Sequence, residues 1–385
     1  MSSEYLVRDK EIRMKKIDKM MEDLNLDAVL FIAPAQMAYQ MSVKYVTGIT
    51  LGTRRAVAFK ERGKEPAFAR PMAVKTKVVN KSTQMQGFIL PENRYAGDLI
   101  EICKEFIGNM PQTTPRIGLN SAGEIPYEIY VALQGTKAEF IDITREFTIV
   151  RSNKSENEIA LTKITSDLAV ASFEEVVRRI KPGKTESELV GGAIGFLAER
   201  GAGELLILAT SKRPYADIRK PTDIQVGETD IFTYSAEFEG PGGYWTQVIR
   251  PIFMDRNSQQ DAYEIWKVAL EADQAAARVM RPGKRVCDIH FAIEEVLDKH
   301  GMYMSYWAGH GMGCDLGDGV DISPENEMEI VPNMVLTLQP SINSDTNSIL
   351  FGNTFLSTEN GDPICLTGKY MDSPYYEDLY KEICK

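Results

Sequence analysis

Residues 180–201 read IKPGKTESELVGGAIGFLAERG, and residues 280–301 read MRPGKRVCDIHFAIEEVLDKHG. The two segments align without gaps at an offset of 100 residues. Each copy begins with a Pro-Gly turn that ends one helix, continues as a new helix and closes with a glycine, the usual residue just beyond a helix C-terminus. The identical positions are Pro182, Gly183, Lys184, Leu197 and Gly201, each repeated one hundred residues later.

Strand-like segments follow each copy. They read ELLILAT, DIFTYSAEFEG and YWTQVIRPIF after the first copy, and YMSYWAGHGMG, MVLTLQPSI and TFLSTENGDPICLT after the second. Two copies of helices followed by strands predict a pseudo-two-fold α+β domain, with a curved sheet in its middle and a pocket inside that sheet. The alternative is that PGK turns between helices simply recur.

The first part of the chain has another pattern, in which amphipathic helices alternate with short strands. We expect helices near residues 12–24, 95–107 and 126–134, and strands at LDAVLFIAP, RRAVAF, RIGLN and AEFIDIT. This pattern predicts a smaller α/β layer domain. Ser155 and Glu158 form a capping-box signature that opens a long helix to about Ile180. We therefore predict domains at residues 1–150 and 151–385.

The composition and net charge of the chain exclude some classes of binding partner. The chain has 385 residues, 43% of them hydrophobic, and 44 basic against 55 acidic side chains, which gives a net charge of −11. Such a charge repels nucleic acid. No apolar run has the length of a membrane span and the first residues are highly charged, so we expect a cytoplasmic protein without membrane contact. Five separated cysteines without a CxxC pair predict free thiols.

Taken together, the motifs AGHGMG, IVRSNKSENEIALTK, MRPGKRVCDI and TFLSTENGDPICLT resemble the pita-bread family of methionine aminopeptidases, prolidases, aminopeptidase P and creatinase. The resemblance covers essentially the whole chain. It implies a pita-bread C-terminal domain with a pseudo-two-fold repeat and a smaller α/β N-terminal domain of the kind that prolidases and creatinase carry. It also implies a homodimer in which the N-terminal domain contributes to the site of the partner chain.

In the metallopeptidase members of this family, two Asp, one His and two Glu hold a pair of divalent metals. Only His310 matches here, because the other positions read Thr233, Gln247, Gln339 and either Gly352 or Asn353. Two cations about 3.5–4 Å apart need anionic oxygen ligands, which neutral amides and a hydroxyl do not supply. We therefore expect no metal and no other cofactor.

The remaining candidate ligands have simpler interpretations. We expect His290 and His300 to have structural roles in a helix, and Cys314 to pack in the core rather than act as a nucleophile. We expect solvated loop or sheet-edge positions for the nearby acids, which are Glu237, Glu239, Asp315, Asp318, Asp321, Glu325, Glu327 and Glu329.

Creatinase is the family member that cleaves a C–N bond without metal, and the resemblance to it is incomplete. Its two guanidinium-binding glutamates fall on Ile249 and Gln339, and its proton-shuttling histidine falls near Asp217 or Ile218. A cationic guanidinium would lack its counter-charges here, which argues against creatine as the substrate.

The predicted pocket is neutral and polar. We expect His310, at its usual pKa of about 6.5, to transfer a proton. The substrate-binding side chains would be Thr233, Ser235, Gln247, Tyr306, Trp307, Gln339 and Asn353. These amides alternatively satisfy one another inside the sheet. The resemblance also implies that Arg54 or Arg55 holds a substrate carboxylate from the partner chain, which the planar guanidinium suits; both alternatively lie on the surface.

The leading hypothesis is a metal-independent hydrolase that acts on a C–N bond in a small carboxylated nitrogen compound. One alternative is a catalytically silent module that binds a metabolite or a peptide. The other is an Xaa-Pro peptidase with relocated metal ligands.

Overall fold

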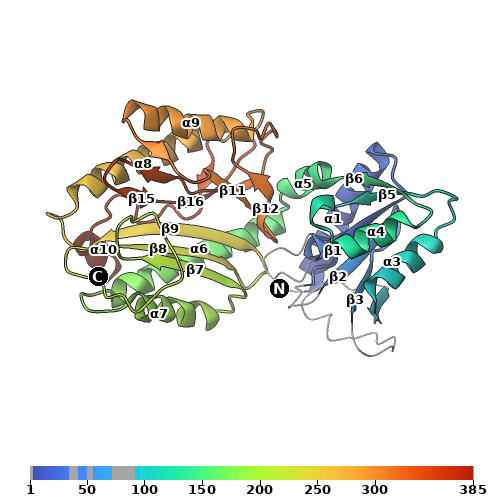
Figure 1. The fold of residues 1–385 in the computed structure, drawn as a ribbon, viewed down its shortest axis with the longest axis horizontal. Helices are drawn as coiled ribbons and strands as arrows, with labels where there is room; N and C mark the ends of the chain where they lie inside the picture. The colour runs from blue at the N-terminus through green and yellow to red at the C-terminus, as the bar shows by residue number, and fades with distance from the viewer. Residues whose placement is uncertain (1–2, 34–41, 50–54, 72–91, 97, 385) are drawn as a thin grey trace. The chain divides into compact units, whose positions relative to one another are not determined.

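The computed structural model describes residues 3–33, 42–49, 55–71, 92–96 and 98–384. It divides into two compact units. The first comprises residues 1–151 together with 314–316, and the second comprises residues 152–313 together with 317–385. Each unit has its own sheets and its own hydrophobic core (Figure 1).

The first unit is built on a six-stranded sheet in the order β4-β3-β2-β1-β5-β6. Every residue of the central strand β1 is buried, as its continuous apolar sequence predicts. Helices α3 and α4 pack their apolar residues against this sheet. The elements are α1 Ser3–Asp23, β1 Ala28–Ala33, α2 Val43–Thr47, β2 Ala56–Glu61, β3 Ala67–Pro71, β4 Glu92–Ala96, α3 Leu99–Gly108, β5 Arg116–Leu119, a 3₁₀ turn Ala122–Glu124, α4 Tyr127–Gln134, β6 Glu139–Asp142 and α5 Thr144–Ser152.

The second unit begins with two helices and a three-stranded sheet. Ser155 accepts a hydrogen bond from the Glu158 N–H, and the Glu158 side chain bonds back to the Ser155 N–H, which confirms the predicted capping box. Helices α6 and α7 cover one face of the sheet β7-β8-β9, with apolar side chains between the layers (Figure 1). These elements are α6 Glu156–Arg179, α7 Glu186–Ala198, β7 Leu205–Thr210, β8 Ile231–Glu239 and β9 Trp245–Phe253.

The second half of this unit repeats the plan with more strands. Helices α8 and α9 lie on the side opposite α6 and α7, and the strands run between the two pairs (Figure 1). The strands form the sheets β12-β11-β13-β16-β17 and β10-β14-β15. The elements are α8 Gln260–Val279, α9 Val286–Lys299, β10 Tyr303–Met304, β11 Gly309–Met312, β12 Leu316–Asp321, β13 Val335–Leu338, β14 Ser341–Asn343, β15 Ser348–Leu350, β16 Asn353–Leu356, β17 Ile364–Cys365 and α10 Tyr376–Ile383.

The backbone of the two halves confirms the internal repeat. Gly183 and Gly283 have φ angles of 89° and 83°, and their N–H groups donate to the carbonyls of Val226 and Ile330 at 2.9 and 3.3 Å. The halves join where Ile249 and Gly352 exchange two backbone hydrogen bonds of 3.1 and 3.2 Å. This bridge therefore connects the sheet β7-β8-β9 of the first half to the strands of the second half.

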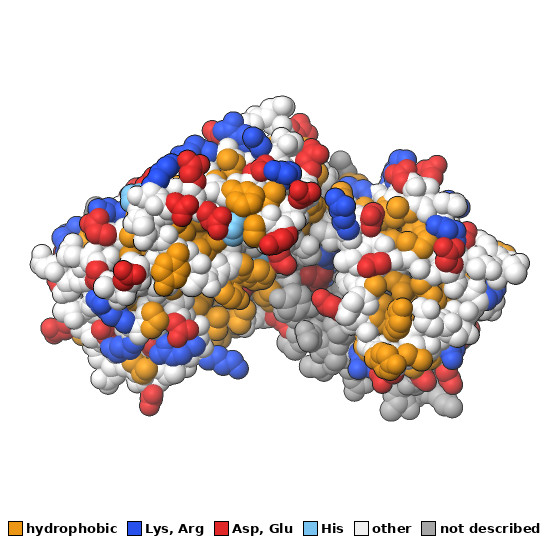
Figure 2. Space-filling view, turned by 45° about the horizontal axis from the view of Figure 1, so that its top comes forward, with side chains coloured by type: hydrophobic (Ala, Val, Ile, Leu, Met, Phe, Trp, Pro, Cys, Tyr) orange, Lys and Arg blue, Asp and Glu red, His pale blue; other side chains and the backbone are white. Residues whose placement is uncertain are grey.

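Several predictions from composition are also tested by the structure. All five cysteines are free thiols, as expected. Within the described residues, no helix combines the length and the apolarity that crossing a bilayer requires. Acidic and basic side chains are interspersed over the visible face of each unit, and no continuous basic surface appears there (Figure 2).

Candidate functional site

His310 lies in the middle of the second unit, on strand β11. This strand pairs with β13, so that His310 stands opposite Thr337. The close approach depends on Gly309, whose φ is 150° and at which an added Cβ would lie 2.0 Å from the Thr337 carbonyl oxygen. The imidazole is only 1% exposed, and its Nδ1 lies 3.0 Å from the Gly311 carbonyl oxygen. Because a carbonyl only accepts hydrogen bonds, Nδ1 carries the proton and Nε2 is left as an acceptor.

Glu237 faces the free nitrogen of that imidazole. Its Oε1 lies 3.4 Å from His310 Nε2, and it has no hydrogen-bond partner among the described residues. Strand β8 carries Glu237 opposite Gln247 on β9. The side chain is only 5% exposed, and this burial raises the pKa of Glu237 to about 8. Near neutral pH the carboxyl therefore holds a proton and carries no charge.

Two expectations from the sequence are corrected by this geometry. The pKa of His310 is lowered to about 4 by burial, against the expected value near 6.5, because a charged imidazole would be desolvated in the sheet. The sequence predicts solvated positions for eight acids near His310. This prediction is confirmed for Asp321, Glu325, Glu327 and Glu329, which are exposed, and is wrong for the other four. Buried acids are Glu237, Glu239, Asp315 and Asp318.

The amide of Gln247 is engaged next to this pair. The Thr337 hydroxyl donates to Gln247 Oε1 across 3.0 Å, which links β9 to β13. On β8, the Thr233 hydroxyl donates to the Tyr215 carbonyl oxygen at 2.8 Å, and Ser235 is almost completely buried. The three predicted binding residues Thr233, Ser235 and Gln247 therefore lie on two adjacent strands, all buried.

Asn353, on β16, is held by a buried cation. Its Oδ1 accepts a hydrogen bond of 2.7 Å from the Arg250 guanidinium, and its Nδ2 donates to Asp273 at 3.1 Å. Burial lowers the pKa of Arg250 to about 10 and raises the pKa of Asp273 to about 7. The Asn353 side chain is thus surrounded by protein partners, while its role in substrate binding stays a prediction.

Two aromatic rings, those of Tyr306 and Trp307, lie between the protein surface and the imidazole of His310. Tyr306 is 62% exposed, and its ring centroid lies 5.7 Å from that of Trp307. Trp307 lies 5.1 Å from the His310 ring, and its buried Nε1 has no hydrogen-bond partner among the described residues. Gln339 is buried, and its N–H donates to the Ala308 carbonyl just before strand β11. The structure therefore brings Trp307 against His310 and leaves Tyr306 in solvent.

The two arginines of the first unit stand apart from this cluster. Arg54 lies outside the described residues. Arg55 forms an ion pair with Glu128, at the start of helix α4, and both side chains are exposed. The other two histidines have structural places on α9. His290 is buried and contacts Glu294, and His300 ends the helix and contacts Glu271 at 3.0 Å.

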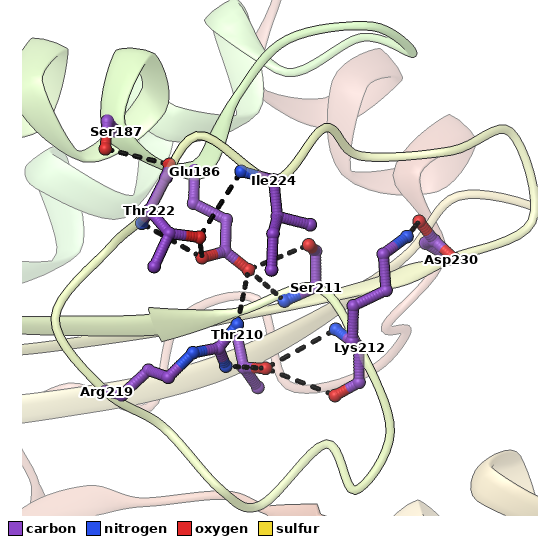
Figure 3. A network of polar contacts seen from close by, with 9 residues as sticks. All are labelled: Glu186, Ser187, Thr210, Ser211, Lys212, Arg219, Thr222, Ile224 and Asp230. Atoms are coloured by element: carbon purple, nitrogen blue, oxygen red, sulfur yellow. Dashed lines mark hydrogen bonds and ion pairs between the residues drawn. The ribbon is translucent and has the colours of Figure 1, made fainter.

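The connection between β7 and β8 is anchored by a carboxylate that the sequence did not single out (Figure 3). Glu186, in the first turn of α7, accepts hydrogen bonds from the N–H and hydroxyl of Ser211 at 2.7 and 2.8 Å. It accepts two more from Thr222 at 3.1 and 2.9 Å. Burial alone would raise the pKa of Glu186, but these donors lower it below the ordinary value. The anchored loop carries Tyr215, whose carbonyl receives the Thr233 hydroxyl.

Comparisons with known proteins agree with this architecture. A protein described as an uncharacterized peptidase of Staphylococcus aureus (strain bovine RF122 / ET3-1) is 25% identical over 344 residues, covering 86% of this chain and 92% of its own. The uncharacterized peptidase YqhT of Bacillus subtilis is 22% identical over 359 residues, covering 91% and 96%.

Solved structures show the same fold. A prolidase from Pyrococcus horikoshii has a TM-score of 0.76 at 19% identity and covers 92% of this chain and 97% of its own. An Xaa-Pro dipeptidase from Bacillus anthracis has a TM-score of 0.78 at 18% identity, covering 94% and 98%.

Two family matches span most of the sequence. Residues 13–152 match the Creatinase/Prolidase N-terminal domain. Residues 160–359, more than half of the chain, match metallopeptidase family M24. The predicted pita-bread fold and family are confirmed, and the chain belongs to the hydrolases of metallopeptidase family M24.

Proposed function

We propose that this chain is a metal-independent hydrolase that cleaves a C–N bond in a small carboxylated nitrogen compound, with His310 as the residue that transfers a proton. A dipeptide is one such compound, and we propose it as the first candidate because the similar structure from Bacillus anthracis is named an Xaa-Pro dipeptidase. We further propose a cytoplasmic homodimer in which Arg54 or Arg55 binds the substrate carboxylate in the partner's site.

The observation that carries this proposal is the set of side chains at the family's metal positions. Gln247 and Asn353 are neutral amides whose oxygens already accept hydrogen bonds, from Thr337 and from Arg250. The Thr233 hydroxyl donates to a backbone carbonyl. A divalent cation beside Asn353 would also be repelled by the buried guanidinium of Arg250. These residues do not fit a pair of metals, and no reaction step is assigned to a metal.

The chemistry left to the site is proton transfer by neutral groups. With Nδ1 bonded to the Gly311 carbonyl, His310 Nε2 is free to accept a proton from a water molecule. The amides of Gln247 and Gln339, the hydroxyls of Thr233 and Ser235, and the rings of Tyr306 and Trp307 would orient the substrate. Binding by this set favours uncharged groups near the reacting bond, because it offers no ionised counter-charge.

The test is turnover by purified full-length protein after exhaustive chelation. The panel contains dipeptides with and without C-terminal proline, N-acyl amino acids and guanidino acids. We expect one class to be hydrolysed without added metal and the activity to fall at least 100-fold in His310→Ala, while His300→Ala, at the exposed end of α9, retains it. Elemental analysis that finds about two tightly bound transition metals per chain, with activity lost on their removal, would overturn the proposal.

The two alternatives give different results in the same assays. A silent binding module would show a ligand-induced rise of the melting temperature without any product. A peptidase with relocated ligands would need acids around His310. Among the described residues, no group of three His, Cys, Asp or Glu side chains placed to hold a metal ion includes His310.

A further inference from the structure

Glu237 is the buried titratable group closest to His310 that the proposed function leaves without a role. The two side chains come from different halves of the repeat, on β8 and β11, and Glu237 Oε1 lies 3.4 Å from His310 Nε2. Its Oε1 and the Trp307 Nε1 are both buried polar atoms without a hydrogen-bond partner among the described residues. Buried polar groups are normally paired, so two unpaired atoms at one imidazole indicate a place for a ligand.

We infer that Glu237 is a second catalytic residue, which gives its carboxyl proton to the leaving nitrogen while His310 takes a proton from the attacking water. The substrate class is accordingly an unactivated amide, whose nitrogen must be protonated to leave as an amine. This inference rests on the proposed hydrolase function and adds to it a named acid and a named class of bond.

The positions of the protons support this assignment. The Gly311 carbonyl fixes the proton of the neutral imidazole on Nδ1, which leaves a lone pair on Nε2 toward Glu237. An uncharged carboxyl group presents an O–H that can donate. Burial favours the neutral form of both groups, and the pKa directions of Glu237 and His310 agree with it. The pair therefore begins with one base and one acid side by side.

The reaction balances without any further reactant. Water adds its hydroxide to the carbonyl carbon as His310 Nε2 takes the proton. The C–N bond breaks with its electron pair on nitrogen, and that nitrogen takes the proton of Glu237. The resulting imidazolium then returns its proton to the Glu237 carboxylate across the 3.4 Å contact, which closes by a few tenths of an ångström for the transfer. The net change is amide plus water giving acid plus amine.

Gln247 and Trp307 are the neighbours of this pair on β9 and in front of β11. Gln247 stands directly opposite Glu237 in the β8–β9 ladder, and its side chain is fixed by the Thr337 hydroxyl. Trp307 covers one face of the His310 ring. Its unpaired N–H can donate to the substrate carbonyl oxygen, on which negative charge develops as water adds.

The experiment compares two leaving groups on one acyl group. The amide that the wild type hydrolyses is prepared also as the p-nitrophenyl ester, whose phenolate leaves without a proton. In Glu237→Gln we expect kcat for the amide to fall at least 100-fold at unchanged KM, whereas ester hydrolysis stays within about 5-fold of wild type. His310→Ala should impair both reactions, because both need the attacking water to be activated.

The matched control is Glu239→Gln, which alters an equally buried glutamate two residues along β8. This variant should retain both activities. Glu237→Asp keeps a carboxyl group at this position and should therefore retain part of the amide activity. This variant tests the inference if Glu237→Gln folds poorly. Equal loss of amide and ester hydrolysis in Glu237→Gln, or full retention of both, would overturn the inference alone. Absence of any turnover by the wild type would instead overturn the proposed function, and this inference with it.

Discussion

The guanidinium of Arg250 donates a hydrogen bond of 2.7 Å to Oδ1 of Asn353, inside the core of the second unit. The same group also donates to the carbonyl oxygens of Ile249 at 2.9 Å, Gly352 at 2.8 Å and Thr367 at 2.6 Å. It thereby ties together the segments at which the two halves of the repeat meet.

Replacing this cation should therefore be costly. We expect Arg250→Met to lower the free energy of unfolding by about 3–5 kcal/mol, because it leaves several buried carbonyls without their donor and removes the cation near Asp273. The control is Arg256→Met, which removes an exposed ion pair with Asp378 and should therefore cost much less stability than Arg250→Met. Urea unfolding followed by circular dichroism measures both values, and equal costs would contradict the role given to Arg250.

Gly309 should tolerate no side chain. An added Cβ would lie 2.0 Å from the Thr337 carbonyl oxygen, and backbone cannot move aside as a flexible side chain would. We expect Gly309→Ala to separate β11 from β13, abolish activity and lower the melting temperature strongly. Gly311→Ala, whose Cβ would meet its nearest atom at 3.1 Å, should be milder. Thermal unfolding of the two variants, with the wild type beside them, tests this order.

The loop anchored by Glu186 should loosen in acid. A carboxyl with a lowered folded pKa stabilises the protein above its ordinary pKa of about 4.5, and this contribution is lost as the pH falls through the folded value. At pH 7 we expect Glu186→Gln to cost about 1–3 kcal/mol, since an amide cannot accept the bonds of both Ser211 and Thr222. At pH 3 the difference should shrink. Faster hydrogen exchange at the Ser211 and Thr222 amides would localise the effect, and Glu199→Gln, exposed at the C-terminal end of the same helix, serves as the control.

The titration of Glu237 should lower the free energy of unfolding as the pH rises. Because its folded pKa is raised to about 8, the folded state is favoured fully below the ordinary pKa near 4.5 and loses stability as the pH rises toward 8. The slope is at most about 1.4 kcal/mol per pH unit for one proton. In Glu237→Gln the part of the slope that comes from Glu237 should disappear, leaving that of Asp273, whose folded pKa is raised to about 7, and the variant should be more stable than wild type at pH 8. Denaturant unfolding from pH 5 to pH 8 compares the two curves.

The pH dependence of kcat/KM should be bell-shaped. Below about pH 4 the imidazole of His310 is protonated and accepts no proton, and above about pH 8 the Glu237 carboxyl has lost the proton that it donates. The two limbs belong to the interacting pair rather than to either residue alone. The residual activity of Glu237→Gln should lack the alkaline limb, whereas Glu239→Gln should keep both. A wild-type profile that is flat from pH 5 to pH 10 would contradict this assignment.

Much of the architecture could be predicted because local residue patterns determine it. The Pro-Gly turns, the Ser155–Glu158 capping box and the apolar run of β1 all act within a few residues. The sequence did not predict strand β4, because its residues, ENRYA, lack the apolar side chains that indicate a strand. Such a polar strand occurs here at the edge of the sheet.

The partner of His310 was harder to predict. All nine residues of β8 are buried, so the strand shows no alternation that would tell which face Glu237 occupies. Its place opposite Gln247 depends on the register of the β8–β9 hairpin, and its contact with His310 joins positions 73 residues apart. The raised pKa of Glu237 and the lowered pKa of His310 follow from that burial. Pairing the two strands of the hairpin from the Gly240–Tyr244 turn is the one sequence signal that would have placed Glu237 beside Gln247.

The joining of the two halves at Ile249 and Gly352 has a consequence for how the chain can be divided. Glu237 lies before this junction in the sequence and His310 after the next two helices, so a cut between β9 and α8 would give two fragments, each with one member of the pair. Neither fragment alone could hold a proton-sharing couple. Mixing the two fragments would restore the Glu237–His310 pair only if they form the backbone hydrogen bonds between Ile249 and Gly352 again. The recovered activity would then measure the association of the two halves.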